Sequence, residues 1–132
     1  MPDATDSMIL SFFDDAIEAA RQRDLNGFEI AVRSALDLDH VAGSRAAEAA
    51  LRAALETHDP RLTGSVEAIV ALSERFAARE DQVAMSMPFM YELTIRRALE
   101  EPGAGDNVNV LQTVIYALQI IRFLRDDEWN ID

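Results

Sequence analysis

The segment 108–125, VNVLQTVIYALQIIRFLR, constrains the fold more than any other part of the chain. Its apolar side chains recur every three or four residues, which is the period of an α-helix. They form a wide stripe at Val108, Leu111, Val114, Ile115, Leu118, Ile121 and Leu124, with Val110 and Ile120 besides. Because so wide a stripe needs apolar neighbours on several sides, we expect this helix to be central and the most buried. Polar residues interrupt it too often for a membrane span.

The same helical period recurs along the rest of the chain, and no stretch alternates with period two for long enough to indicate a sheet. The text predicts helices over about 6–25, 28–38 and 44–59, and a fourth beginning at 63–65. The third is rich in alanine, which favours close packing in the interior. Pro88 indicates either a kink or a new helix start, and that helix is expected to run to about Glu101. The sequence therefore predicts an all-α fold, a compact bundle of five or six helices built from α-hairpins, with a long central C-terminal helix.

Local signals predict where these helices begin and end. Asp6 or Ser7 is the expected N-cap of the first helix, and Ser44 that of the third, because their side-chain oxygens can accept from free backbone N–H groups. The pair Asn26-Gly27 is expected to break the chain between the first two helices. The last helix is expected to be capped by Asp106 or Asn107.

The domain organisation follows from length and hydrophobicity. The chain has 132 residues, of which 49% are hydrophobic, and this suffices for one domain with a real core. We expect a single helical domain over 1–132, with 1–6 and 126–132 as candidate flexible tails. The stretch RDLNGFEIAVRSALDLD (23–39) resembles the second half of a tetratricopeptide hairpin, which implies a helical repeat. The alternative is an ordinary bundle, since three regular copies are absent.

The charge of the chain restricts its partners. The net charge is −12, so direct nucleic-acid binding and attraction to anionic membranes are not expected, whereas a protein with a basic surface is. There is no cysteine, which fits a cytoplasmic location, and all 12 basic residues are arginine, so thiolate and lysine chemistry are excluded.

The polar residues show no pattern typical of catalysis or of cofactor binding. His40 and His58 have no Glu or His at zinc-binding spacing. Asp37, Asp39 and Glu48 occupy positions 1, 3 and 12 of a calcium loop, but Val41 and Ala42 stand where a ligand and a glycine are needed. We therefore expect no catalytic residue, no bound metal and no cofactor, and no enzyme activity.

The C-terminal text RDDEWNID contains the only tryptophan of the chain, Trp129, directly after Asp126, Asp127 and Glu128. Acids at a helix C-terminus oppose the helix dipole, so we expect the last helix to end near them and Trp129 to lie in an extended or turned tail. That tail either folds onto the core or anchors a partner. The candidate partner-binding residues are Asp126, Asp127, Glu128, Trp129, Asp14, Asp15 and Glu18.

Three functions remain open from the sequence. The first is an acidic, non-catalytic protein-interaction module, an inhibitor, immunity or regulatory adaptor protein acting on a basic partner. The second is a self-assembling structural or accessory subunit, a homodimer that completes its core across an interface. The third is a small-molecule or enzymatic site in a pocket walled by Phe and Met. The run MSMPFMYEL (85–93) could supply such side chains.

Overall fold

The computed structural model describes residues 4–59, 62, 65–79, 88–99 and 110–129, with only the backbone of Ala4, Val110, Asp127, Glu128 and Trp129. Within these residues the chain forms six α-helices and no β-strand. They are α1 (Ala4–Arg21), α2 (Leu25–Leu38), α3 (His40–His58), α4 (Val66–Ala77), α5 (Pro88–Ala98) and α6 (Val110–Trp129). The prediction of an all-α helical bundle is confirmed.

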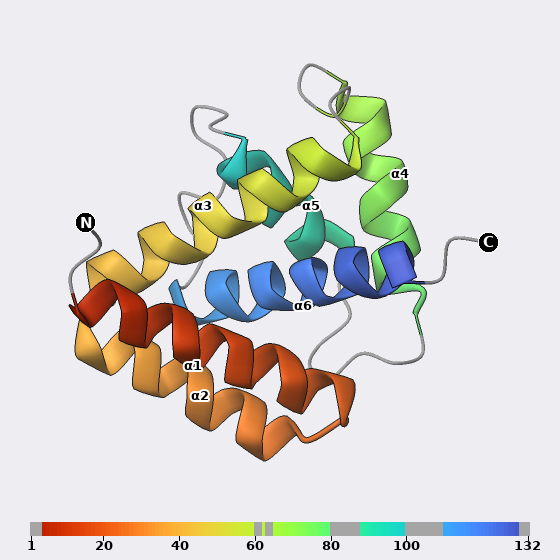
Figure 1. Cartoon of the computed structure of the whole chain (residues 1–132). Coiled ribbons are helices and arrows are strands. Elements are labelled where there is room, and N and C mark those ends of the chain that lie inside the picture. The colour runs from red at the N-terminus through yellow and green to blue at the C-terminus, as the bar shows by residue number, and fades with distance from the viewer. Residues whose placement is uncertain (1–3, 60–61, 63–64, 80–87, 100–109, 130–132) are drawn as a thin grey trace.

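Helix α6 is the centre of the bundle (Figure 1). It runs between α1 and α3, while α1 and α2 form an antiparallel hairpin along one side. It packs against α1, α2, α3 and α5, and it reaches α4 through the stacked rings of Phe76 and Phe123, whose centroids are 5.6 Å apart. The central position predicted for the last helix is confirmed.

Burial on α6 extends beyond the expected apolar stripe. Every residue from Tyr116 to Leu124 is buried, including the polar Gln119 and the charged Arg122. Nine consecutive residues of an α-helix point in all directions around its axis, so the helix is covered on all sides over this length.

The core has an aliphatic part and an aromatic part. The N-terminal hairpin and α3 contribute mostly aliphatic side chains, together with Phe13 and Phe28. At the other end α4, α5 and α6 meet in a ring cluster, in which Tyr91 contacts Tyr116 edge-on at 4.7 Å and Phe76 at 5.9 Å. Such tilted and edge-on pairs are the favoured aromatic geometries, and they add to the stabilisation from buried area.

The break between α1 and α2 falls earlier than predicted. Asn26 and Gly27 lie in the first turn of α2, and the chain turns at 22–24, where Arg23 has a φ of 56°. Asp24 is the N-cap, and its side chain accepts a hydrogen bond from the Gly27 N–H at 2.9 Å. A Cβ on Gly27 would lie 2.4 Å from Oδ2 of Asp24, so the glycine makes room for the cap.

The start of α1 also differs from the sequence interpretation, since the helix already includes Ala4 and continues through Asp6 and Ser7. In α3 the N-cap is Asp39 instead of Ser44: its side chain accepts from the Ala42 N–H at 3.0 Å, and the helix begins at His40. Both errors have one cause, because each region contains more than one residue with a cap-forming side chain and residue type alone does not choose among them.

The alanine-rich helix α3 is not interior, contrary to expectation. Only one stripe of it is buried, formed by Gly43, Ala47, Leu51 and Leu55, and Ala49 and Ala53 are exposed. Alanine is the best helix former and exposes little apolar area, so its abundance does not require burial. Gly43 allows a close approach to α2, because a Cβ at this position would lie 3.0 Å from Leu36 Cδ2.

Of the two alternatives at Pro88, a kink or a new helix start, the structure has the helix start, since α5 begins at this residue. A proline suits the first turn of a helix. Helix α5 ends at Ala98, three residues before the expected end. The expected caps Asp106 and Asn107 lie outside the described residues.

Candidate partner-binding surface

Helix α1 carries three of the candidate partner-binding acids on its outer side. Its buried positions are Ile9, Phe13, Ala16, Ile17 and Ala20. The three acids Asp14, Asp15 and Glu18 are exposed, and the exposed fractions of the Asp14 and Glu18 side chains are 73% and 58%. Both Asp14 and Glu18 take part in ion pairs, whereas Asp15 pairs with no arginine in the part of the chain that the structure describes.

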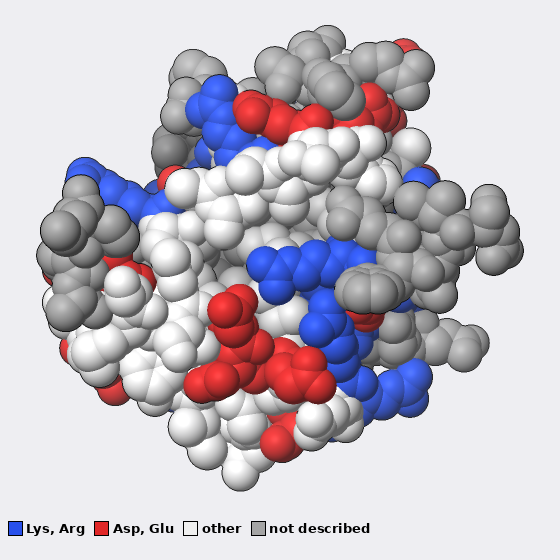
Figure 2. Space-filling view, in the orientation of Figure 1, with Lys and Arg blue, Asp and Glu red and all other residues white. Residues whose placement is uncertain are grey.

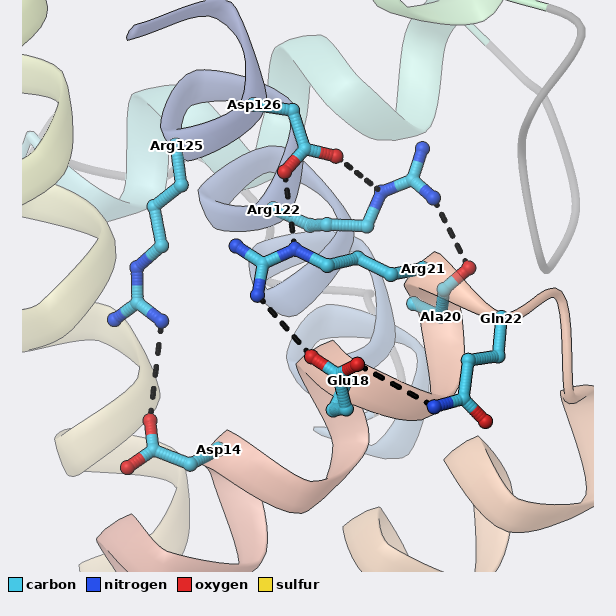
Figure 3. Close-up of polar contacts among 8 residues, drawn as sticks. All are labelled: Asp14, Glu18, Ala20, Arg21, Gln22, Arg122, Arg125 and Asp126. Carbon is cyan, nitrogen blue, oxygen red and sulfur yellow. Dashed lines mark hydrogen bonds and ion pairs between the residues drawn. The ribbon is translucent and has the colours of Figure 1, made fainter. Parts of the chain in front are cut away.

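An ion-pair network joins the end of α1 to the end of α6 (Figure 3). Arg21 Nε donates to Asp126 Oδ1 at 3.0 Å, and Arg21 Nη1 donates to Glu18 Oε2 at 3.3 Å. One turn away, Nη1 of Arg125 lies 3.8 Å from Oδ1 of Asp14. The fold therefore brings Asp14, Glu18 and Asp126 to a single seam, although the last of these is more than a hundred residues from the first two.

Asp126 is held more firmly than the acids of α1. Its side chain is 25% exposed, and its second oxygen, Oδ2, lies 3.7 Å from Nε of Arg122. Arg122 is buried, and its Nη1 donates to the backbone carbonyl of Ala20 at 3.0 Å. Because that carbonyl belongs to the last turn of α1, a buried cation meets the negative end of the α1 dipole there.

The same contacts act on the pKa of Arg21. Partial burial acts to lower the pKa of Arg21, but hydrogen bonds and Coulombic attraction from Asp126 and Glu18 outweigh it, so the pKa is raised above its ordinary value. The two carboxylates thus stabilise the charge that every arginine carries at neutral pH.

The last helix does end beside the three acids, but the prediction that Trp129 lies in an extended or turned tail is wrong. Helix α6 continues through Asp126, Asp127 and Glu128 to Trp129. The unfavourable charge at the C-terminal end is offset by Arg21 and Arg122, which flank Asp126 on both oxygens. The side chains of Asp127, Glu128 and Trp129 lie outside the described part of the structure, so the choice between a clasp and an anchor for Trp129 stays a prediction.

The surface beside the network combines acidic and apolar groups. Figure 2 shows acidic atoms gathered over α1, next to arginine atoms. On the same helix Met8 and Leu10 are 47% and 49% exposed. We call the exposed residues Met8, Leu10, Asp14, Asp15 and Glu18 the α1 face.

The other candidate groups are scattered. His40 is the first residue of α3 and His58 the last, so about 27 Å of helix separates them and they share no site. Of the run 85–93, Met90 is partly buried against the core, Tyr91 is fully buried and Phe89 is 63% exposed. Met85 and Met87 lie outside the described residues.

Among the described residues, no group of three or more His, Asp or Glu is arranged to hold a metal ion. No helix in the described ranges is long and apolar enough to cross a membrane. Comparison with family models, with curated proteins and with solved structures finds no match.

Sequence reasoning gives one contact of the seam, because Arg21 follows Glu18 at a helical spacing of three residues and pairs with it in the structure. It missed the pairing of Arg21 with Asp126 and the parts played by Arg122 and Arg125. A signal for Arg122 was present, because this residue stands inside the apolar stripe of the last helix, where a charged residue needs compensation. Arg125 stands in polar surroundings that give no such signal.

Proposed function

We propose that this chain is a non-catalytic interaction module that binds a basic surface of another protein through the α1 face. The observation that carries the proposal is the exposure of three neighbouring acids, Asp14, Asp15 and Glu18, on a helix that is anchored in the core. Exposed Met8 and Leu10 on the same helix add apolar contact area. Carboxylates around an apolar contact complement a basic partner.

The ion pairs of the α1 face leave its acids accessible to a partner. The Asp14–Arg125 and Glu18–Arg21 pairs span 3.8 and 3.3 Å, and their side chains are partly or largely exposed. Exposed pairs of this kind contribute only about 0–1 kcal/mol each to stability. A partner's Arg or Lys therefore replaces Arg125 or Arg21 at little cost, while the half-buried Asp126 keeps α1 and α6 in register.

Long-range attraction supports the same function. With a net charge of −12 the whole chain draws a basic protein towards it, and such steering raises association rates above those of uncharged pairs. An inhibitor, immunity or regulatory adaptor protein of this kind would use its carboxylates to occupy a basic, phosphate-binding surface of its partner. A cytoplasmic encounter is part of this proposal, and the lack of cysteine fits it.

The test compares two baits of equal net charge. One bait carries Asp14→Asn, Asp15→Asn and Glu18→Gln on the α1 face, and the other carries Asp37→Asn, Glu67→Gln and Glu74→Gln, which are exposed acids of α2 and α4. Each bait is used beside the unmodified chain in pull-downs from the source cells at about 0.15 M salt, where the Debye length is about 8 Å.

We expect the unmodified chain and the α2/α4 bait to capture proteins that the α1-face bait does not capture. The melting temperatures of both variant baits should equal that of the unmodified chain. Equal capture by both baits would show that only net charge matters, and the α1 face would then not be the site. Loss with the α2/α4 bait alone would place the site at the acids of α2 or α4 instead of the α1 face.

A further inference from the structure

The outer side of α3 carries a pattern of alternating charge. We call Arg45, Glu48, Arg52 and Glu56 the α3 stripe; they follow one another at spacings of three or four residues, outside the buried stripe of the helix. Arg45 and Glu56 are exposed, and the exposed fractions of the Arg52 and Glu56 side chains are 41% and 49%. Read along the helix, the charges are plus, minus, plus, minus.

The α3 stripe holds an arginine that forms no ion pair within the part of the chain that the structure describes. Glu48 pairs with Arg97 of α5, and Glu56 pairs with Arg52 at 2.9 Å. Arg45 makes no ion pair or hydrogen bond with any described residue. An unpaired, exposed arginine is unexpected on a chain with twice as many acids as basic residues, 24 against 12.

We propose that two copies of the chain pair through their α3 helices, antiparallel, about a two-fold axis between Ala50 and Leu51. Such an axis places Arg45 opposite Glu56 of the partner subunit, and Glu56 opposite Arg45 of the partner subunit. The same axis brings Arg52 within one residue of the position directly opposite Glu48 of the partner subunit. The α3 stripe is therefore self-complementary, as a two-fold interface requires.

The direction of the pairing follows from the charges. In a parallel arrangement in register, Arg45 would face Arg45 of the partner subunit and each glutamate would face its own copy. Like charges in direct opposition are destabilising, so the stripe disfavours the parallel pair. Only the antiparallel arrangement gives every charge of the stripe an opposite neighbour.

The shape of this surface permits close contact. Ala49 and Ala53 lie exposed between the charged residues, and small side chains let two helices approach closely. Beside them runs an open groove of about 530 Å³, lined by the α3 stripe together with Arg97 and Ala98 of α5. This groove has room for the long arginine and glutamate side chains of the partner subunit's α3 helix.

The strength of the dimer is limited by the length of the contact. Helix α3 has 19 residues and is therefore about 28 Å long. One helix pair of this length buries less than the roughly 1,200–2,000 Å² of a stable complex, which indicates weak association. We expect a dissociation constant in the micromolar range at about 0.15 M salt, where overall repulsion between the acidic copies is screened.

The experiment is sedimentation velocity of the full chain from about 5 to 500 μM, with charge-reversed variants. The unmodified chain is expected to show a concentration-dependent dimer. Arg45→Glu and Glu56→Arg each place like charges at both contact points, so each variant alone should raise the dissociation constant at least tenfold. An equimolar mixture of the two variants restores both opposite-charge contacts and should recover the dimer, as should the double variant Arg45→Glu/Glu56→Arg.

The matched control is Arg33→Glu, which makes the same charge change at an exposed position of α2 and should leave the dimer intact. Circular dichroism of each variant checks that the helices are retained. The proposal is overturned by an unmodified chain that stays monomeric at 500 μM, or by a mixture that stays as monomeric as its components. An equal loss of dimer with Arg33→Glu would overturn it as well. The variant lacking the α1-face acids should dimerise normally, so failure of the partner proposal leaves this test unaffected.

Discussion

Arg21 and Asp126 stand 105 residues apart in the sequence, yet Nε of the first donates to Oδ1 of the second across 3.0 Å. Arg21 is the last residue of α1 and Asp126 lies in the last turn of α6, so this contact fixes the end of the N-terminal hairpin to the end of the central helix. It also explains how α6 continues through three consecutive acids. The first of them, Asp126, is neutralised from both sides by Arg21 and Arg122.

Substituting Asp126 should therefore cost stability. Asp126→Ala removes the carboxylate from two arginines, one of which is buried, and we expect the free energy of unfolding to fall by about 1–3 kcal/mol. Urea denaturation at neutral pH measures it. The control is Asp15→Ala at an exposed position of α1, which should change the free energy of unfolding by less than about 0.5 kcal/mol. Equal effects of the two substitutions would mean that the seam does not stabilise the fold.

The central helix gives a second prediction, on packing. Leu118 is fully buried, so Leu118→Ala should lower the free energy of unfolding by about 2–5 kcal/mol through lost apolar burial and the cavity left behind. The matched control is Leu10→Ala on α1, because Leu10 is 49% exposed and should cost less than about 1 kcal/mol. A loss below about 0.5 kcal/mol for Leu118→Ala would contradict the central position of α6.

A third prediction separates the two candidate caps of α3. Asp39→Ala removes the oxygen that accepts from the Ala42 N–H and should destabilise the protein by about 0.5–2 kcal/mol. Ser44 lies within the helix, so Ser44→Ala should be neutral or slightly stabilising, since alanine has the higher helix propensity. Thermal melts of both variants decide between the caps, and the opposite ranking would move the start of α3 to the position that the sequence favoured.

The helices themselves were predictable from the sequence because burial follows the helical period closely. In α1 the residues Ile9, Phe13, Ile17 and Ala20 recur at helical spacing and are buried, and the part of the predicted α6 stripe around Leu118 is buried too. The ends of the helices were less predictable. Ser44 and Asp39 are equally good caps when judged by residue type, and only the packing of α2 against α3 selects the second.

The candidate surface was predictable only in part. The acids Asp14, Asp15 and Glu18 fall on the outer side of α1 because the apolar period of that helix places them there. Their meeting with Asp126 depends on how α6 lies across α1, and helical periodicity contains no information about that arrangement. The same applies to α3, where the alanines suggested burial although the tertiary fold leaves one side of the helix exposed.

The last prediction concerns the charge buried in the core. Arg122 is 3% exposed, and its guanidinium is held by the carbonyl of Ala20, by Asp126 and by the ring of Phe123, whose centroid is 4.6 Å from Cζ. Arg122→Ala removes these contacts together with the packed aliphatic stem, and we expect a loss of about 3–5 kcal/mol. Arg122→Met keeps most of the stem volume and leaves Asp126 paired with Arg21, so it should cost at least about 1 kcal/mol less than Arg122→Ala.

Guanidinium denaturation of both variants, repeated in the Asp126→Ala background, measures the contributions of the aliphatic stem and of the ion pair separately. In the Asp126→Ala background, Arg122→Met should lower the free energy of unfolding by less than it does in the unmodified chain, because Arg122 has already lost the carboxylate of Asp126. The difference is the coupling energy of the pair, which we expect to be about 0.5–3 kcal/mol. If Met and Ala cost the same and the coupling is zero, neither the stem nor the ion pair of Arg122 stabilises the core.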